Sequence, residues 1–445
     1  MPSTVFDSAI YRDFFGTPAM RAVWSDEALV ARYVEVEVAL AKAEGRVGVI
    51  PAEAAKEIAA NADASKLDLA KLKAETDIVG YPIIGIVHQM AKQCGEAGRY
   101  VHWGATTQDI MDSATVLQLR AALDIIDDEL HAVARALEAL AAKHRDTVMA
   151  GRTHMQHALP VTFGYKAAVW LSSVRRDKQR LAELRKRLLV VQFSGAAGTL
   201  ASLGGDGLKV QAALAEELNL AQPDITWHAA RDTIAEVGGA LAILSGGLAK
   251  IATDVMLMMQ TEVGEAFEPF VKGRGGSSTM PQKRNPISCE MILAIAKAVR
   301  SDAGLLLDAM AADHERATGP WHLEWIALPR AFIATAGALH QARFMLEGLI
   351  VDGDRMRRNL DITGGLIVAE AAMMALAPYT GRGAAHDIVY ECCREALNNG
   401  TTLLEQLEKR ADVTQHIQGS DLARVVDPAH YLGTAGEMID QMLKG

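Results

Sequence analysis

Three polar segments of the chain combine residue types that could bind a carboxylate and move a proton. Segment 102–109 reads His-Trp-Gly-Ala-Thr-Thr-Gln-Asp, and segment 152–160 reads Arg-Thr-His-Met-Gln-His-Ala-Leu-Pro. Segment 272–286 is a glycine-rich run followed by Ser-Ser-Thr-Met-Pro-Gln-Lys-Arg-Asn-Pro. Acid–base chemistry and anion binding need these hydroxyls, amides, histidines and cations. Because functional side chains concentrate in irregular segments held by regular ones, the three segments form the candidate site.

Segment 272–286 has the most specific pattern. Its glycines permit a mobile loop with unusual backbone angles. Ser277 could lose its proton only if Lys283 and backbone N–H groups stabilised an alkoxide. The run is neither a P-loop nor a dinucleotide fingerprint, since no Gly-Lys-Ser/Thr and no third spaced glycine follow. A simple connecting loop would not need this combination.

Segment 102–109 precedes a long helix, where hydroxyls and free N–H groups at the helix N-terminus can hold a carboxylate. The alternative is an ordinary N-cap made by Thr106, Thr107 or Asp109.

Segment 152–160 carries two histidines. A lone histidine would favour a packing role, but two of them beside a cation and an amide favour a functional one.

The sequence from Gly276 to Pro286 resembles the signature of the fumarase/aspartase superfamily at every defining position. The other two segments fall in the order of that superfamily's remaining signature regions, so the resemblance covers essentially the whole chain. It implies a serine alkoxide that removes a proton beside a carboxylate, followed by expulsion of an amine or oxygen leaving group. By this resemblance Ser277 is the base and His154 protonates the leaving group.

The resemblance also implies how the substrate is bound. Lys283 and Asn285 would hold the reacting carboxylate, and Thr106, Thr107 and Gln108 would bind a carboxylate. Candidates for a second carboxylate are Arg21, Arg152, Lys272 and Arg316, and further substrate-binding candidates are Thr153, Gln156, His157, Ser278 and Met280. No metal and no organic cofactor are implied. The expected substrate is a small di- or tricarboxylate, and the expected assembly is a homotetramer with active sites shared between subunits.

Several stretches resemble 3-carboxy-cis,cis-muconate cycloisomerases more than adenylosuccinate lyases, the next relatives. They are 15–21, 102–109, 260–269, His314-Glu315-Arg316 with Trp321 and Trp325, and 365–378. Bacterial cycloisomerases carry tryptophan at the position of His154, whereas lyases that release fumarate carry histidine in a Thr-His-x-Gln arrangement. Segment 75–81 lacks the His-Asp pair of adenylosuccinate lyases. The resemblance therefore implies elimination from a substituted succinate, with lactone formation as the alternative and adenylosuccinate cleavage as a lesser one.

The elements that must position these segments are long helices, so the expected fold class is all-α with a central bundle. Apolar residues alternate by three and four along 116–140 and 234–258. Apolar helical stretches also cover 161–191, 287–310 and 331–350. The apolar seams either fill the core of one subunit or lie partly between subunits.

Three helical regions are expected: an N-terminal domain over 1–110, the bundle over 111–355 and a C-terminal domain over 356–445. The first contains a helix predicted over 26–45 with a cap at Ser25. After the bundle, glycine-marked breaks divide the chain into shorter helices.

Composition and charge argue against some classes of binding partner. The net charge is −10 and no basic cluster is dense enough to track a phosphate backbone, which argues against nucleic acid. The four cysteines have no CxxC spacing, and no basic n-region with an apolar h-region opens the sequence. We therefore expect a cytoplasmic protein that does not bind membranes.

The rival classes are a non-catalytic helical scaffold and a coiled-coil interaction protein, neither of which explains the glycine-serine segment.

Overall fold

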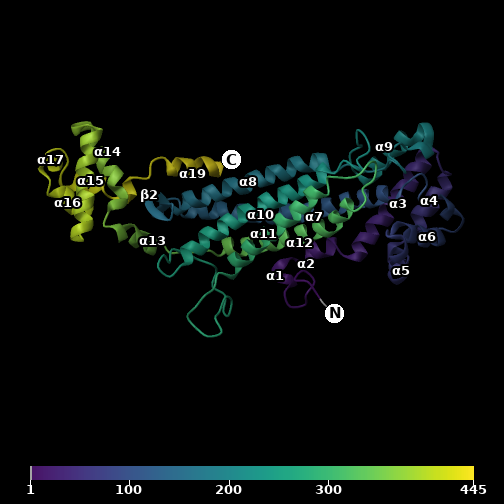
Figure 1. The fold of residues 1–445 in the computed structure, drawn as a ribbon, viewed down its shortest axis with the longest axis horizontal. Helices are drawn as coiled ribbons and strands as arrows, with labels where there is room; N and C mark the ends of the chain where they lie inside the picture. The colour runs from purple at the N-terminus through teal and green to yellow at the C-terminus, as the bar shows by residue number, and fades with distance from the viewer. Residues whose placement is uncertain (1–2, 445) are drawn as a thin grey trace. The chain divides into compact units, whose positions relative to one another are not determined.

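The computed structural model describes residues 3–444 and is mainly α-helical, which confirms the predicted fold class (Figure 1). Internal contacts divide the chain into two compact units, each assembled from three stretches. Unit 1 comprises Met1–Leu130, Arg176–Ala249 and Met291–Gln341, and unit 2 comprises His131–Arg175, Lys250–Glu290 and Ala342–Gly445. The division into three domains at residues 110 and 355 stays a prediction.

Unit 1 contains most of the shorter N-terminal helices. They are α1 (Arg12–Phe15), α2 (Pro18–Val23), α3 (Asp26–Val47), α4 (Ala52–Asn61), α5 (Leu69–Val79), α6 (Ile83–Gln93) and α9 (Gly207–Leu218). The expected helix over 26–45 is α3, and its N-cap is Ser25, whose side chain accepts a hydrogen bond from the Ala28 N–H. It ends at Gly48, which adopts φ +89°.

Five long helices contribute residues to both units. They are α7 (Thr107–Lys143), α8 (Phe163–Leu188), α10 (Asp232–Met259), α11 (Ile287–Asp308) and α12 (Pro320–Glu347). The two predicted seams are buried in a single chain, so they fill its own core, which is the first of the two alternatives. Helix α7 starts nine residues before Val116, where the apolar pattern begins, because Asp112 and Asp109 continue the seam at the same spacing and are buried as charges.

Helix α10 is, among the residues the structure describes, the helix that is long and apolar enough by composition to cross a membrane. Its apolar residues recur at helical spacing and are buried inside the protein. They are Ile234, Val237, Leu241, Leu244, Leu248, Ile251, Val255 and Met258. This burial accounts for the hydropathy of the helix as that of a core helix.

Unit 2 contains the shorter C-terminal helices that the glycine-marked breaks predict. They are α13 (Gly353–Leu360), α14 (Ala369–Thr380), α15 (Arg382–Asn399), α16 (Leu403–Glu408), α17 (Ala411–Thr414), α18 (Gly419–Val425) and α19 (Ala435–Lys444). Four of them, α14 to α17, lie together in Figure 1 and share one apolar cluster that includes Leu376, Val389 and Leu407.

A β-hairpin in unit 2 was not predicted. Strands β1 (Val148–Thr153) and β2 (Gln156–Thr162) pair antiparallel, with Thr153 opposite Gln156, and a two-residue pair β3 (Ala266–Phe267) and β4 (Ile350–Val351) lies elsewhere in the unit. The two turn residues of the hairpin, His154 and Met155, have φ of +51° and +65°. Positive φ at both positions is the geometry of tight two-residue hairpins, which is normally made by Asn-Gly. His154-Met155 carries no such turn signal.

Candidate active site

Segment 102–109 forms the start of α7 in unit 1, where Thr106 and Thr107 are half-buried. The Thr106 N–H donates to a carboxylate oxygen of Asp109 at 3.0 Å, so the ordinary cap exists here as well. Gln108 is buried, and its amide nitrogen donates to Asp112 and to the His228 carbonyl. The two threonines are thus partly accessible, whereas Gln108 points into the protein.

Asp109 fixes the position of this segment. One of its oxygens accepts the Ser194 N–H at 2.9 Å and lies 2.8 Å from Nε2 of His228, and the other accepts the Gly195 N–H at 2.9 Å. A carboxylate that is fully buried and held by several donors resists displacement. The backbone that carries the two threonines is therefore rigidly held.

Arg316 is the predicted cation that lies at this segment. Its guanidinium donates to Oγ1 of Thr106 at 3.2 Å and to the Ala196 carbonyl at 2.8 Å. Arg21 forms an ion pair with Asp13 and donates to the Arg12 carbonyl, so its charge is partly compensated. The hydroxyls and the Arg316 guanidinium together suit a substrate carboxylate.

The hairpin carries the second segment, and its Arg152 forms a structural ion pair. Arg152 donates through two nitrogens to both oxygens of Glu265, at 2.7 and 2.8 Å. Glu265 is completely buried and also accepts from the Asn359 amide at 2.7 Å. Since an isolated buried carboxylate would be strongly unfavourable, Arg152 neutralises it and holds the hairpin in place.

His154 lies at the exposed tip of this hairpin, next to Thr153 and Gln156, which are exposed as well. A non-glycine residue at positive φ is strained by about 1–3 kcal/mol, and such strain concentrates at functional sites. His157 points inward on β2, where its Nδ1 is buried without a partner among the described residues. Burial and the neighbouring Arg152 lower the pKa of His157.

Segment 272–286 is an exposed loop of unit 2 that is closed at its base by backbone contacts. Gly276 bridges Arg284 in antiparallel fashion, and the Asn285 N–H donates to the Gly275 carbonyl at 2.8 Å. Gly275 has φ +69°, and a Cβ there would lie 2.5 Å from the Asn285 oxygen, so only glycine fits. The residues that flank the loop are joined as well. The buried Glu268, before the loop, accepts the N–H of Cys289 on α11 at 2.9 Å.

Ser277 follows Gly276 in this loop and is half-buried. Its Oγ accepts two backbone hydrogen bonds, from the Thr279 N–H at 3.2 Å and from the Met280 N–H at 3.0 Å. Two N–H dipoles aimed at one hydroxyl oxygen favour negative charge on it. The loop therefore has the local geometry that an alkoxide needs.

The other predicted loop residues surround Ser277 in sequence. Lys283 is exposed, and its N–H closes a turn by donating to the Met280 carbonyl at 3.1 Å. Asn285 is half-buried at the base of the loop, whereas Lys272, Ser278 and the Met280 side chain are exposed. All of these side chains are accessible to a ligand.

Sequence reasoning missed the buried charges that hold the candidate residues. In unit 1, Arg231 pairs with Asp112 and with Glu324, and in unit 2 Glu265 pairs with Arg152. For Asp112 a signal existed, because it occupies a position of the apolar seam on α7. Within residues 3–444 no cluster of three or more His, Cys, Asp or Glu side chains is arranged to hold a metal ion.

Comparisons with known proteins identify the family of the chain. A lyase family model matches residues 15–301, and a model of the adenylosuccinate lyase C-terminus matches residues 365–442. The chain is 47% identical over 445 residues to the 3-carboxy-cis,cis-muconate cycloisomerase of Pseudomonas aeruginosa, covering 99% of this chain and 97% of that one. It is 48% identical over 444 residues to trans-aconitate decarboxylase 1 of Mycosarcoma maydis, covering 100% of this chain and 90% of that one.

The fold is equally well matched. The crystal structure of a fumarate lyase from Mesorhizobium sp. BNC1 superposes with a TM-score of 0.91 at 54% identity, covering 97% of this chain and 98% of that one. The resemblance that the glycine-serine segment indicates is thus confirmed along the whole chain. The protein belongs to the lyase family, and with it to the fumarase/aspartase superfamily of enzymes.

Proposed function

We propose that this enzyme removes a proton from the carbon beside a carboxylate of a substituted succinate and eliminates an amine or oxygen group, leaving fumarate or an analogue. The observation that carries this proposal is the pair of backbone N–H groups donating to Oγ of Ser277. These donors would stabilise the alkoxide that abstracts the proton. Lys283 and Asn285 would hold the reacting carboxylate and spread the negative charge of the intermediate.

His154 is the residue that favours elimination. It is exposed at a strained hairpin tip, so its ring is available to protonate a departing group. A leaving amine or alkoxide needs that proton, whereas ring closure to a lactone expels no group. Thr106, Thr107 and Arg316 would bind a second carboxylate, which makes a small di- or tricarboxylate the substrate.

The second candidate function is 3-carboxy-cis,cis-muconate cycloisomerisation. It is favoured by the match of almost the entire chain to cycloisomerases, at 47% identity for the one from Pseudomonas aeruginosa. The same base and carboxylate-binding groups would serve that reaction. In it His154 would have a supporting role.

The proposed assembly is a cytoplasmic homotetramer with shared active sites. Large apolar side chains remain exposed on the long helices, and they include Val169 on α8, Ile243 on α10, Leu307 on α11 and Ile326 on α12. Exposed apolar side chains on several helices of one protein are typical of subunit interfaces. Sedimentation analysis of the purified protein would test the tetramer.

The activity is tested by absorbance near 240 nm with fumarate plus amines, adenylosuccinate, argininosuccinate and 3-carboxy-cis,cis-muconate. Consumption or release of fumarate establishes a lyase, whereas loss of the muconate chromophore alone establishes the cycloisomerase. Ser277→Ala should reduce turnover at least about 10³-fold. The matched control is Ser301→Ala on the exposed side of α11. Near-normal turnover of Ser277→Ala would remove the assigned base.

A further inference from the structure

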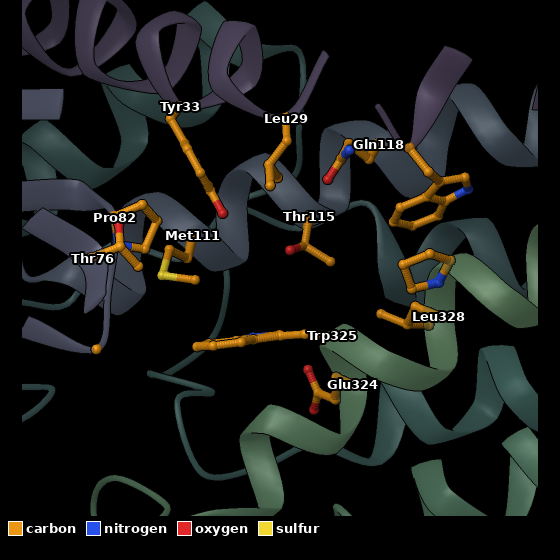
Figure 2. A pocket seen from close by; sticks show the side chains of 13 residues that line it. Leu29, Tyr33, Thr76, Pro82, Met111, Thr115, Gln118, Glu324, Trp325 and Leu328 are labelled. Atoms are coloured by element: carbon orange, nitrogen blue, oxygen red, sulfur yellow. The ribbon is translucent and has the colours of Figure 1, made fainter. Parts of the chain in front are cut away.

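An apolar cavity of about 280 Å³ lies within unit 1, lined by side chains of α3, α7 and α12 (Figure 2). Figure 2 shows the ring of Trp325 edge-on, with Met111, Thr115 and Tyr33 on one side of its plane. Leu29 and Leu328 add further apolar surface. An apolar cavity of about 150 Å³ is enough to accept benzene, so this one has room for an aromatic ring with its attachment.

The aromatic wall of the cavity is held rigidly. Trp325 packs edge-to-face on Trp321 with ring centroids 5.1 Å apart, and the His322 ring lies 4.4 Å away. Trp321 in turn stacks on Tyr81 at 5.8 Å. A ring fixed by three neighbours loses little conformational freedom when a ligand stacks on it.

Three polar side chains in the wall have internal partners, whereas the buried Nε1 of Trp24 has none among the described residues. The Gln118 amide donates to the Val23 carbonyl at 2.8 Å, and the Thr76 hydroxyl donates to the Leu72 carbonyl at 2.8 Å. Glu324 is buried and pairs with Arg231. None of the thirteen described lining residues is a lysine, arginine or histidine.

The charge beneath the cavity disfavours an anion. Arg231 serves two buried carboxylates, Asp112 at 2.8 Å and Glu324 at 2.5 Å. Burial, together with Asp112, raises the pKa of Tyr33 and keeps its phenol neutral. A phosphate or carboxylate placed here would meet no free cation and two acidic groups, so its desolvation would be uncompensated.

The cavity continues the carboxylate-binding segment along one face of α7. Thr107, Met111, Thr115 and Gln118 follow at spacings of four, four and three residues, which places them on one side of the helix. At 1.5 Å per residue the cavity wall begins about 6 Å beyond Thr107 and extends to about 16 Å. A ligand whose carboxylate is held at Thr106 and Thr107 therefore has its distal end at the cavity.

We propose that this cavity receives an uncharged, apolar or aromatic substituent of the substrate, so that the enzyme acts on succinates whose leaving group ends in such a substituent. The proposal rests on the function assigned above and names its substrate class. In the reaction the base takes a proton from C3, the bond from C2 to nitrogen or oxygen breaks with its electron pair on the heteroatom, and the heteroatom takes up a proton. The products are fumarate and an aryl- or alkyl-substituted amine or alcohol.

Binding of unreactive carbon analogues tests the cavity independently of catalysis. By calorimetry, 2-benzylsuccinate should bind at least tenfold more tightly than 2-methylsuccinate and than tricarballylate, which carries a carboxylate in place of the ring. Thr115→Phe fills the cavity and should reduce the benzyl-to-methyl ratio at least fivefold. Thr434→Phe, at an exposed position, should leave that ratio unchanged.

Equal binding of the benzyl and methyl compounds, or tighter binding of tricarballylate, would overturn the proposal. If Thr115→Phe does not fold, Leu328→Ala provides the second variant, because it enlarges the cavity and should improve binding of 2-(naphthylmethyl)succinate relative to 2-benzylsuccinate; unchanged selectivity would contradict the assignment. Fumarate release from 2-(benzylamino)succinate is measured in parallel. Selective binding without fumarate release would refute the proposed elimination and leave the cavity assignment standing.

Discussion

The buried carboxyl of Glu44 should make the stability of this enzyme fall as the pH rises. Glu44 lies on α3 and is completely buried, and neither of its side-chain oxygens has a hydrogen-bond partner among the described residues. Glu37, two turns earlier on the same helix, is also buried and lies 2.6 Å from Nδ1 of His102. Burial, and then the charge of Glu37, raise the pKa of Glu44 from 4.5 to about 9.

The sign and size of the effect follow from proton linkage. A folded-state pKa above the unfolded value means that the folded protein binds the extra proton, so stability is fully present below pH 4.5 and is lost as the pH rises through about 9. One pH unit inside this window changes the free energy of unfolding by about 1.4 kcal/mol. Between pH 5 and pH 8 the contribution of Glu44 should therefore decrease by about 4 kcal/mol.

Glu44→Gln keeps the shape of the side chain and removes the titration. Urea unfolding of wild type and variant at pH 5 and pH 8, at one protein concentration, measures the difference. Wild type should lose about 4 kcal/mol more than the variant over this range. The control, Glu35→Gln on the exposed face of α3, should keep the wild-type slope. Parallel pH dependences for wild type and Glu44→Gln would refute the buried neutral carboxyl.

Two further predictions concern the hairpin. His154→Asn should slow elimination of poor leaving groups more than of good ones, since a general acid matters only when the departing group needs a proton; equal losses across a leaving-group series, measured by fumarate release, would count against that role. Arg152→Ala should destabilise the protein by about 3–5 kcal/mol by leaving the buried Glu265 unpaired. Its thermal midpoint should fall clearly below that of Arg185→Ala, whose partner Asp124 is exposed.

Helical periodicity predicted the helices whose buried side chains are apolar and recur at regular spacing. The seams of α7 and α10 are such elements, and Ser25 marked the start of α3. The β-hairpin escaped because its turn, His154-Met155, contains neither glycine nor asparagine. That backbone is held by the Arg152–Glu265 pair, whose partners are 113 residues apart in the sequence.

The roles assigned to the loop residues stay predictions, and the structure adds only their local geometry. Ser277, Lys283 and Asn285 lie on one loop, as their spacing indicates. The difference between Thr106, which is half-buried, and Gln108, which is buried, was not predictable, because it depends on how α7 is rotated. That rotation is set by Asp112 and Arg231, whose pairing only the folded chain reveals.

The proposed carboxylate-binding threonines and the proposed base Ser277 differ in how firmly the protein holds them. Asp109 ties the carboxylate-binding threonines to Ser194, Gly195 and His228, so moving these hydroxyls would break several bonds to a buried charge. Ser277 instead lies on an exposed, glycine-containing loop that is fixed mainly at its base. A rigid carboxylate site binds substrate without reorganisation, whereas a movable base can form its alkoxide after water has left. On this reasoning, stiffening the loop should impair turnover more than substrate binding.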